Sequence, residues 1–522
     1  MNHIGIIKFV LASVPILWLL ISLGKLKMPG YRASIIAFII TVLIAALYYS
    51  MPFLRIMQAS LEGVILAIFP ILWVIVSALF VYNTTLATGS MEKIKAMLSS
   101  LSSDRRVQGL ILAFAFGGFL EAVAGFGTAV AIPAGILVAM GFSPILAATV
   151  CLVANTVPVA FGVLGVPIIT LAQVTSLSLD KLALYTAVQL MPFAIFLPLV
   201  LVYVITGSIK KIKGVIGISI IAGIVYSLSQ MLTVIYVGPE LAAVVGSIVA
   251  LLAMVVFIKV FPVKSIWRFA GESSEKVKDT TRGDTLETIK AWSSYIFILI
   301  FIFAIKFISG LDILSKYPFV LSKQFYFGAG GKPMSFQLLT SAGTILFISA
   351  ILGGLIQGGT VKLLYKTLLK TIKQVEKTII TVVSILALAK VMGYSGMVDT
   401  IASTLASASG RFYPMIAPLI GAVGTFITGS DTSSNVLFGN LQKQTALRLG
   451  MNPEWIAASN ASGATLGKMI SPQSIAIASS ATDLTNQEGK ILGTTIRYCL
   501  VYVVIMGLLI FTFSGIVEML SL

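Results

Sequence analysis

Two acidic residues stand in glycine-rich segments that are otherwise built from apolar and small side chains. Glu121 lies in GGFLEAVAGFGTAVAIP, residues 117–133, and Asp431 lies in GTFITGSDTSSNVLFGNLQ, residues 424–442. A charge at membrane depth is costly, about 3 kcal/mol or more, and usually marks a pathway or a proton site. We therefore interpret Glu121 as a functional carboxylate, with a structural ion pair as the alternative.

The second segment carries an unbroken run of small and polar residues at 429–435. An external loop would explain this run, but its place in the chain matches that of the first segment. Non-helical backbone at membrane depth is tolerated only where it is buried in protein or lines a cavity. At the tip of a hairpin, free backbone N–H groups and helix N-termini would favour an anion.

Two further apolar stretches contain polar and helix-breaking residues, which predicts discontinuous helices. The first break spans Asn155 to Pro167, and a simple proline kink would also explain it. The second spans Asn460 to Gln473 and has too many polar groups for that explanation. Broken helices paired with a hairpin in each half of the chain form the substrate site of many secondary transporters.

Three basic residues lie inside apolar stretches, where a cation implies an anionic partner. For Lys390, a neighbouring carboxylate and a bound substrate are equally good partners. Lys468 stands within the polar cluster, which favours a substrate. Arg497 lies about two turns into the last apolar stretch and is a third candidate.

Several enzyme classes are excluded by residue type. The only histidine is His3, so no Ser-His triad, zinc motif or histidine relay can be assembled. The segment GATLGKM, residues 463–469, is one residue short of a phosphate-binding loop and lacks Ser or Thr after its lysine. Cys151 and Cys499 show neither a disulfide pattern nor a metal-ligand spacing. We expect no enzyme activity, no cofactor and no metal site.

The composition indicates a membrane protein. Hydrophobic residues make up 58% of the chain and charged residues 11%, which leaves too little polar surface for a soluble globule. The net charge of +17 comes from short clusters between apolar runs, which is typical of membrane topology signals and not of nucleic-acid binding. A crossing needs roughly 20 apolar residues. The chain is therefore expected to be an all-α polytopic membrane protein with about twelve transmembrane helices. The expected spans lie near 4–24, 32–50, 61–84, 145–173, 182–206, 213–235, 239–262, 292–310, 339–360, 371–394, 455–482 and 491–516.

The chain repeats itself. The order of elements in residues 1–206 recurs in residues 292–522 at an offset of about 305 to 310, and linking helices with a polar loop fill residues 207–291. Each repeat is expected to hold one re-entrant hairpin, near 107–140 in the first and near 413–445 in the second. If both hairpins enter and leave on one face, an odd number of crossings separates equivalent points, so the repeats are inverted.

The distribution of basic residues supports this topology. With the N- and C-termini both outside the cytoplasm, about 23 lysines and arginines fall on the cytoplasmic side and about nine fall outside. That is the asymmetry of the positive-inside rule. The loop 311–338 does not follow this rule, because it places three lysines on the outer side.

Three segments resemble the lactate permease family, whose members carry lactate and glycolate with protons. They are EAVAGFGTAVAIPAGIL from Glu121, TGSDTSSNVLFGNLQ from Thr428 and SNASGATLGKMISPQSIAIA from Ser459. The resemblance extends in order and spacing over nearly the whole chain. It implies a multi-pass protein of the plasma (inner) membrane that works as an elevator, with a scaffold and a moving transport domain.

The resemblance also implies roles for residues. It suggests proton-coupled uptake of lactate and related 2-hydroxymonocarboxylates such as glycolate, with protons and the lipid bilayer as further partners; a homodimer is an open alternative to a monomer. Glu121 and Asp431 would carry protons, because a carboxyl group beside apolar walls holds a proton more readily. Lys468 or Lys390 would face the substrate carboxylate. The remaining substrate-binding residues would be Gly125, Phe126, Gly127, Thr128, Asn155, Ser430, Thr432, Ser433, Ser434, Asn435, Asn460, Ser462, Thr465 and Gln473.

Other functions remain open at this point. Ser, Thr, Asn and backbone carbonyls at hairpin tips also make sodium sites, as in a sodium-coupled carboxylate transporter. A passive anion channel needs only a cationic pore. A membrane-embedded enzyme is the weakest alternative, because histidine and metal motifs are missing from the sequence.

Overall fold

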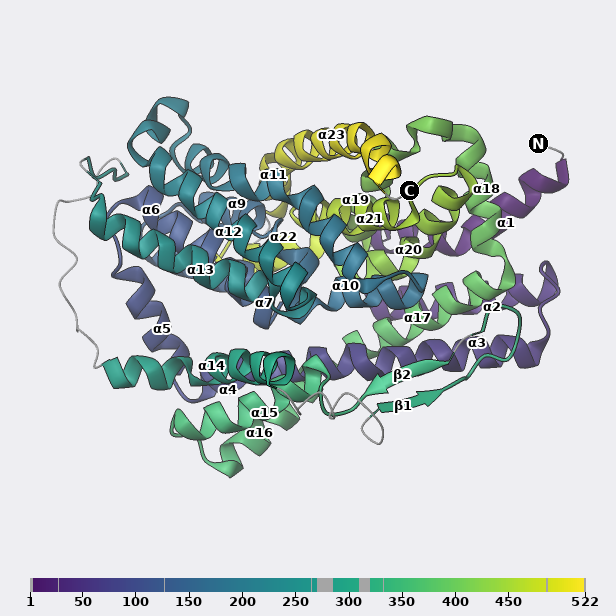
Figure 1. The fold of residues 1–522 in the computed structure, drawn as a ribbon, viewed down its shortest axis with the longest axis horizontal. Helices are drawn as coiled ribbons and strands as arrows, with labels where there is room; N and C mark the ends of the chain where they lie inside the picture. The colour runs from purple at the N-terminus through teal and green to yellow at the C-terminus, as the bar shows by residue number, and fades with distance from the viewer. Residues whose placement is uncertain are drawn as a thin grey trace.

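The structure is a computed structural model that describes residues 3–26, 28–125, 127–263, 265–269, 285–308, 320–331, 333–484 and 487–520. Its secondary structure is almost entirely helical (Figure 1). The helices of the first part of the chain are α1 (His3–Leu19), α2 (Gly30–Leu47), α3 (Phe53–Leu66), α4 (Trp73–Ala87), α5 (Ser90–Ser99), α6 (Arg105–Gly109), α7 (Gly117–Val123), α8 (Thr128–Ala139), α9 (Pro144–Ala154), α10 (Gly162–Thr175) and α11 (Leu179–Thr206). Short π-helical or 3₁₀ segments extend or join them at Leu20–Lys25, Ala67–Leu72, Leu110–Phe116 and Pro158–Phe161.

Two helices link the halves, and a second series follows. The linking helices are α12 (Ile216–Tyr236), preceded by a 3₁₀ segment at Ile209–Val215, and α13 (Pro239–Val260). The second series is α14 (Thr285–Phe307), α15 (Ala342–Ile356), α16 (Val361–Gln374), α17 (Glu376–Ser395), α18 (Met397–Ser409), α19 (Tyr413–Thr428), α20 (Asp431–Arg448), α21 (Pro453–Lys468), α22 (Pro472–Ala481) and α23 (Glu488–Leu520), with a 3₁₀ turn at Gly410–Phe412.

The chain is a polytopic, helical membrane protein. In the described ranges, eleven helical stretches are long and apolar enough to cross a membrane. Two of them, Arg105–Val123 and Met397–Thr428, include the first arms of the expected hairpins. The expected spans 339–360 and 455–482 do not reach this length, because α15 has only 15 residues and the second stretch breaks between α21 and α22. The expected span at 4–24 is also shorter, at Ile7–Leu23.

One small sheet departs from the all-α expectation. Strands β1 (Val320–Lys323) and β2 (Met334–Gln337) pair antiparallel, with Val320 opposite Gln337 and Lys323 opposite Met334. The sheet lies in the discordant loop 311–338, of which residues 311–319 and 332 are outside the described part of the chain.

The helices form two groups that face each other (Figure 1). Helices α2, α3, α4 and α14 to α17 occupy the lower part of the view, and α6 to α13 with α19 to α23 occupy the upper part. The groups touch where α17 packs on α20 and where α10 packs on α4. We name them the lower group and the upper group.

Contacts between the two halves of the chain come in exchanged pairs. Where a helix of the first half packs on a helix of the second, its counterpart in the second half packs on the corresponding helix of the first. Helix α2 packs on α17, and α15 packs on α4. In the same way α1 contacts α18 while α14 contacts α5, α10 contacts α20 while α22 contacts α8, and α11 contacts α21 while α23 contacts α9. Helices at corresponding positions of the two expected repeats therefore make corresponding contacts.

Glycines bring α21 very close to α19. A Cβ atom at Gly463 or Gly467 would overlap the backbone of Pro418 or Ala422, and one at Gly421 would overlap the backbone of Asn460. Close approach of backbones through small residues is a typical way for helices to pack in membranes. This packing fixes the second hairpin against the broken helix that carries Lys468.

Candidate functional site

Each glycine-rich segment folds into a helical hairpin. In the first, the arm that ends in α7 is followed by Ala124, Gly125 and Gly127 and then by α8, which packs back on α7. In the second, α19 and α20 pack together and meet at Gly429 and Ser430. Gly125, Gly127 and Gly429 have φ angles of +57°, +85° and +71°. Only glycine adopts such angles at little cost, so these residues make the tight turns possible.

Two helix breaks lie next to the hairpin tips. The first follows α9: a 3₁₀ turn at Pro158–Phe161 leads to Val163, Leu164 and Gly165, whose φ angles are +47°, +51° and +76°. The second separates Lys468, at the end of α21, from Pro472, at the start of α22. Left-handed angles at Val and Leu cost of order 1 kcal/mol or more each, and such strain often occurs at functional sites.

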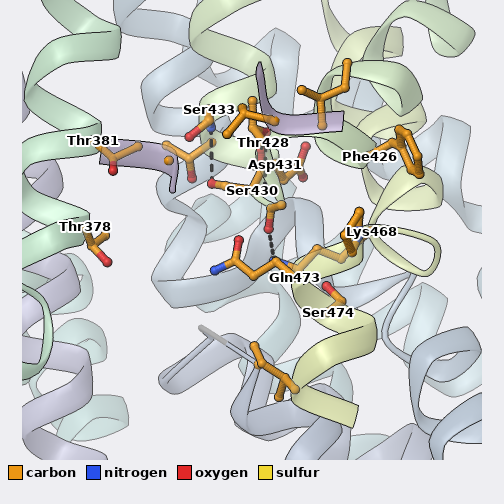
Figure 2. Close-up of a pocket in the computed structure, with 18 of the residues that line it drawn as sticks. Thr378, Thr381, Phe426, Thr428, Ser430, Asp431, Ser433, Lys468, Gln473 and Ser474 are labelled. Carbon is orange, nitrogen blue, oxygen red and sulfur yellow. Dashed lines mark hydrogen bonds between the residues drawn. The ribbon is translucent and has the colours of Figure 1, made fainter. Parts of the chain in front are cut away.

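The tips and breaks surround one cavity of about 970 Å³ between the upper and lower groups. Figure 2 shows Lys468, Gln473 and Ser474 close to Ser430 and Asp431 of the second tip, with Thr378 and Thr381 of α17 across the cavity. Eight of the residues predicted from the sequence line it: Glu121, Gly127, Ser430, Asp431, Thr432, Ser433, Lys468 and Gln473.

The two carboxyl groups at the cavity are deeply buried. Glu121 is 3% exposed and Asp431 is 2% exposed. In the described part of the chain, Oε2 of Glu121 and both carboxyl oxygens of Asp431 have no hydrogen-bond partner. Buried polar atoms are nearly always paired, so oxygens without partners indicate a place for a proton or a ligand.

Lys468 is a cation that lines the same cavity as these carboxyl groups. Its charge acts on both Glu121 and Asp431, and the two carboxyl groups also act on each other. Its Nζ donates a hydrogen bond of 3.1 Å to the carbonyl of Gly429, and neither carboxylate lies within ion-pair distance. The ammonium group is therefore held in place by a neutral partner and can also attract an anion.

Helix N-termini add positive potential to the cavity. Helix α20 starts at Asp431 with Ser430 as its cap, α22 starts at Pro472 with Ser471 as its cap, and α8 starts after Gly127 without a side-chain cap. All three helices begin at or next to residues that line the cavity. Free N–H groups and the helix dipole favour an anion at such positions.

Four predicted site residues do not line the cavity, and their side chains bond to protein. Nδ2 of Asn435 donates to the carbonyl of Pro167, and Nδ2 of Asn460 donates to Oδ1 of Asn435. The Ser462 hydroxyl donates to Gln189, and the Thr465 hydroxyl donates to the carbonyl of Ser462. Their role in binding substrate stays a prediction; what the structure shows is that these side chains tie the second hairpin and α21 to their neighbours.

Three residues near the first tip also stay outside the lining. Gly125 sits in the turn, and the Thr128 hydroxyl donates to its carbonyl over 2.8 Å. Asn155 is 3% exposed, and its side chain lies close enough to Glu121 to act on that carboxyl group. The amide does not reach hydrogen-bonding geometry with any group in the described part of the chain, so it is buried beside Glu121 and remains able to bond to it or to a ligand. Phe126 is outside the described residues.

The remaining predicted residues, Ser434, Lys390 and Arg497, also lie outside the cavity lining. The Ser434 hydroxyl donates to the carbonyl of Gly421 across the second hairpin. Lys390 pairs with the buried Glu62 over 2.8 Å, which is the carboxylate alternative to substrate binding. Arg497 is exposed and does not line the cavity.

Sequence reasoning missed the α17 side of the cavity. Lys377, Thr378 and Thr381 line it together with Tyr31, from the start of α2. Lys377 and Glu488 are both exposed and line the cavity, so they mark its mouth. These residues stand at the ends of apolar runs, where polar side chains are ordinary, and no motif in the sequence distinguishes them.

The comparisons with known proteins agree on one family. A model of the family described as L-lactate permease matches residues 8–517. An L-lactate permease of Streptococcus iniae is 44% identical over 454 residues, which cover 86% of this chain and 93% of the relative. The L-lactate permease of Bacillus subtilis is 34% identical, covering 96% and 94%. The glycolate permease GlcA of Escherichia coli K12 is also 34% identical, covering 98% and 96%.

Among solved structures, the chain is similar to MtrF of Neisseria gonorrhoeae, a protein described with a class of antimetabolite efflux pumps. The TM-score is 0.50, the sequence identity is 14%, and the match covers 95% of this chain and 96% of the other. At this identity the likeness concerns the fold alone. In the described ranges, no three His, Cys, Asp or Glu side chains gather as a metal site would require.

Proposed function

The chain belongs to the L-lactate permease family, and on that premise we propose that it is a secondary active transporter for lactate and glycolate, coupled to protons. Relatives named L-lactate permease and glycolate permease support this substrate class. The observation that carries the proposal is the half-buried Lys468 near two buried carboxyl groups that have oxygens without partners, at a cavity where helix N-termini meet.

The substrate would bind through its carboxylate at Lys468. The carboxylate would also accept hydrogen bonds from the N-termini of α22 and α8. The substrate's 2-hydroxyl group would then bond to the hydroxyl-rich tip of the second hairpin, where Thr428, Ser430 and Ser433 line the cavity. Such a site selects a small carboxylate that carries a hydroxyl group, because a buried polar group left without its partner weakens binding.

Charge balance at the cavity explains why protons would travel with the substrate. With Lys468 charged, the site would be neutral when Glu121 is ionised and Asp431 holds a proton. A bound lactate adds one negative charge, and an uncompensated charge in a buried site is expensive. Neutrality returns if the second carboxyl group also takes up a proton. The site therefore supports symport of one proton with each monocarboxylate.

An elevator with inverted repeats fits the architecture. The exchanged contacts between the halves support a pseudo-twofold relation, and the cytoplasmic excess of basic residues supports the inversion. The upper group, with both hairpins, would be the moving transport domain, and the lower group would be the scaffold. The mouth at Lys377 and Glu488 lies on the expected cytoplasmic side, so we interpret this conformation as open to the cytoplasm.

A sodium-coupled carboxylate transporter is the second candidate. The observation that favours it is the run Gly429, Ser430 and Asp431 at the second tip, which lines the cavity with a backbone carbonyl, a hydroxyl and a carboxylate. Oxygen ligands of this kind also suit Na⁺.

The test is uptake of labelled L-lactate by purified protein in liposomes. Unlabelled glycolate, pyruvate, acetate and citrate are added in turn as competitors. The proposal predicts saturable uptake that glycolate inhibits strongly, that acetate inhibits weakly because it lacks the hydroxyl group, and that citrate does not inhibit. Uptake that does not saturate would instead indicate a passive channel.

A further inference from the structure

Helix α16 presents three different stripes around its circumference. One stripe is buried and packs on α4 and α15. Nδ2 of Asn83 donates to the Thr371 hydroxyl over 2.9 Å and to Oε1 of Gln374 over 3.0 Å, and the side chain of Leu364 lies against Gly354 of α15. These contacts fix the rotation of α16, so its other two stripes are held facing outward.

The second stripe is apolar and exposed. Its four side chains fall within about 80° of the helix circumference. They are Val361 (74% exposed), Tyr365 (61%), Leu369 (49%) and Ile372 (43%). Helix α15, which directly precedes α16 in the chain, also exposes apolar side chains in its last turns, at Leu352, Leu355 and Ile356. A row of exposed apolar side chains on a membrane protein faces lipid.

The third stripe is basic and lies directly beside the apolar one. It consists of four exposed lysines, Lys362, Lys366, Lys370 and Lys373, which also share about 80° of the circumference. No ion pair in the described part of the chain joins any of them to a carboxylate. Four like charges in a row without counter-ions repel one another and attract an anionic surface.

We propose that α16 lies in the membrane interface and binds the phosphates of anionic phospholipids through these four lysines. The apolar stripe would enter the acyl-chain region, and the basic stripe would reach the headgroup layer of the cytoplasmic leaflet. An amphipathic helix with lysines on its polar face is the usual form of such a contact. A protein partner that binds the lysines would not need the exposed apolar stripe beside them.

Lipid bound at α16 would also affect how the lower group is held in the membrane. Helix α16 leads directly into α17, whose Thr378 and Thr381 line the cavity. Lipid bound at α16 would hold the lower group at a fixed depth in the membrane while the upper group moves. The inference about lipid rests on the surface of α16 and not on the substrate or its coupling.

The experiment measures which phospholipids stay with the protein. Wild type, K362Q/K366Q/K370Q/K373Q and the charge-preserving K362R/K366R/K370R/K373R are exchanged into mixed phosphatidylglycerol and phosphatidylcholine micelles, and retained lipid is counted by native mass spectrometry. Wild type and the arginine variant should retain phosphatidylglycerol preferentially. The glutamine variant should lose the preference, with about a fivefold fall in affinity per lysine removed. A variant with four exposed lysines replaced elsewhere, K210Q/K213Q/K259Q/K490Q, is the control and should behave as wild type.

A second measurement keeps the proposal testable if the glutamine variant does not fold. L369C is labelled with an environment-sensitive dye in liposomes; Cys151 and Cys499 are buried and leave the new thiol as the labelling site. Phosphatidylglycerol with brominated acyl chains should quench the dye. Equal retention of phosphatidylglycerol by wild type and glutamine variant would overturn the proposal, and so would a dye at residue 369 that the brominated chains do not quench.

Discussion

The Nζ of Lys468 donates a hydrogen bond of 3.1 Å to the carbonyl oxygen of Gly429. This bond joins the break between α21 and α22 to the tip of the second hairpin. The carbonyl orients the ammonium group without cancelling its charge, so the cation remains available to an anion in the cavity. The bond thus brings to one cavity two segments that lie about 40 residues apart in the chain.

Replacing Lys468 should weaken substrate binding. In K468Q the cation for the substrate carboxylate is lost, and we expect the KM for L-lactate to rise at least about 30-fold, since removing one partner of a buried charge pair costs 2–5 kcal/mol. K468R should keep part of the affinity. K490Q, at an exposed lysine, is the control. The measurement is the concentration dependence of uptake in liposomes; an unchanged KM in K468Q would contradict the assignment.

Replacing Glu121 should separate exchange from accumulation. Glu121→Gln mimics the protonated carboxyl group permanently, so the variant cannot release its proton. We expect accumulation of lactate driven by a pH gradient to be abolished, while counterflow exchange of lactate continues. Both are measured in the same liposome preparation. Normal accumulation by E121Q under a pH gradient would rule out Glu121 as a proton carrier.

The tip of the second hairpin can be tested with a matched pair of glycines. Gly429 and Gly450 have nearly the same φ angles, +71° and +68°. A Cβ at Gly429 would overlap the side chain of Gln473, whereas a Cβ at Gly450 would meet nothing within 4 Å. Both alanine variants carry a similar backbone strain of about 1 kcal/mol. G429A should therefore lose most transport and G450A little, at equal expression, as measured by initial uptake rates.

If G450A were impaired as strongly as G429A, backbone strain alone would explain both variants. The packing of the tip against Gln473 would then have no special part in transport.

The pair formed by Lys390 and Glu62 is expected to stabilise the lower group and not to bind substrate. Oε1 of Glu62 accepts hydrogen bonds of 2.8 Å from both Lys390 and the Tyr394 hydroxyl. K390M leaves a buried carboxylate without its cation, which should reduce the free energy of unfolding by about 3–5 kcal/mol. Thermal denaturation in detergent should show K390M less stable than E62Q/K390M, in which no charge is left.

The same variants test the alternative role of Lys390. At a temperature where K390M is folded, its KM for L-lactate should equal that of wild type. A large rise in KM together with normal stability would return Lys390 to the substrate site.

The sequence predicted the residues at the two hairpin tips that line the cavity better than those on its α17 side. Glu121, Asp431 and Lys468 could be named because a charged or polar side chain in an apolar segment must face protein or a cavity. Asn435 and Asn460 look the same in the sequence, but they hydrogen-bond to each other. Whether an amide faces a neighbour or a cavity depends on the rotation of each helix, and no single segment contains that information.

The sequence predicted the breaks within helices better than it predicted the number of membrane spans. Proline, glycine and polar residues at 155–167 and 460–473 correctly placed two interruptions. Of the expected twelve spans, nine are among the eleven candidates in the described ranges, and the other three are broken or too short for a crossing. The two additional candidates include the first arms of the hairpins. The small sheet β1–β2 was missed, because its strands carry no strong alternation and lie in a polar loop.

The α17 side of the cavity shows why the remainder was missed. Thr378 and Thr381 follow a cluster of lysines at the end of a span, where threonine is unremarkable. Only the packing of the two helix groups places them opposite Asp431. Contacts of this kind depend on how distant parts of the chain meet.

Accumulation of labelled L-lactate in liposomes that contain the purified protein tests the central claim most directly. A proton gradient and a sodium gradient are imposed separately, both directed inward and both at zero membrane potential. The account predicts accumulation above equilibrium under the proton gradient, with no added effect of sodium, and its loss in E121Q. Accumulation that follows the sodium gradient at constant pH, or simple equilibration under both gradients, would contradict it.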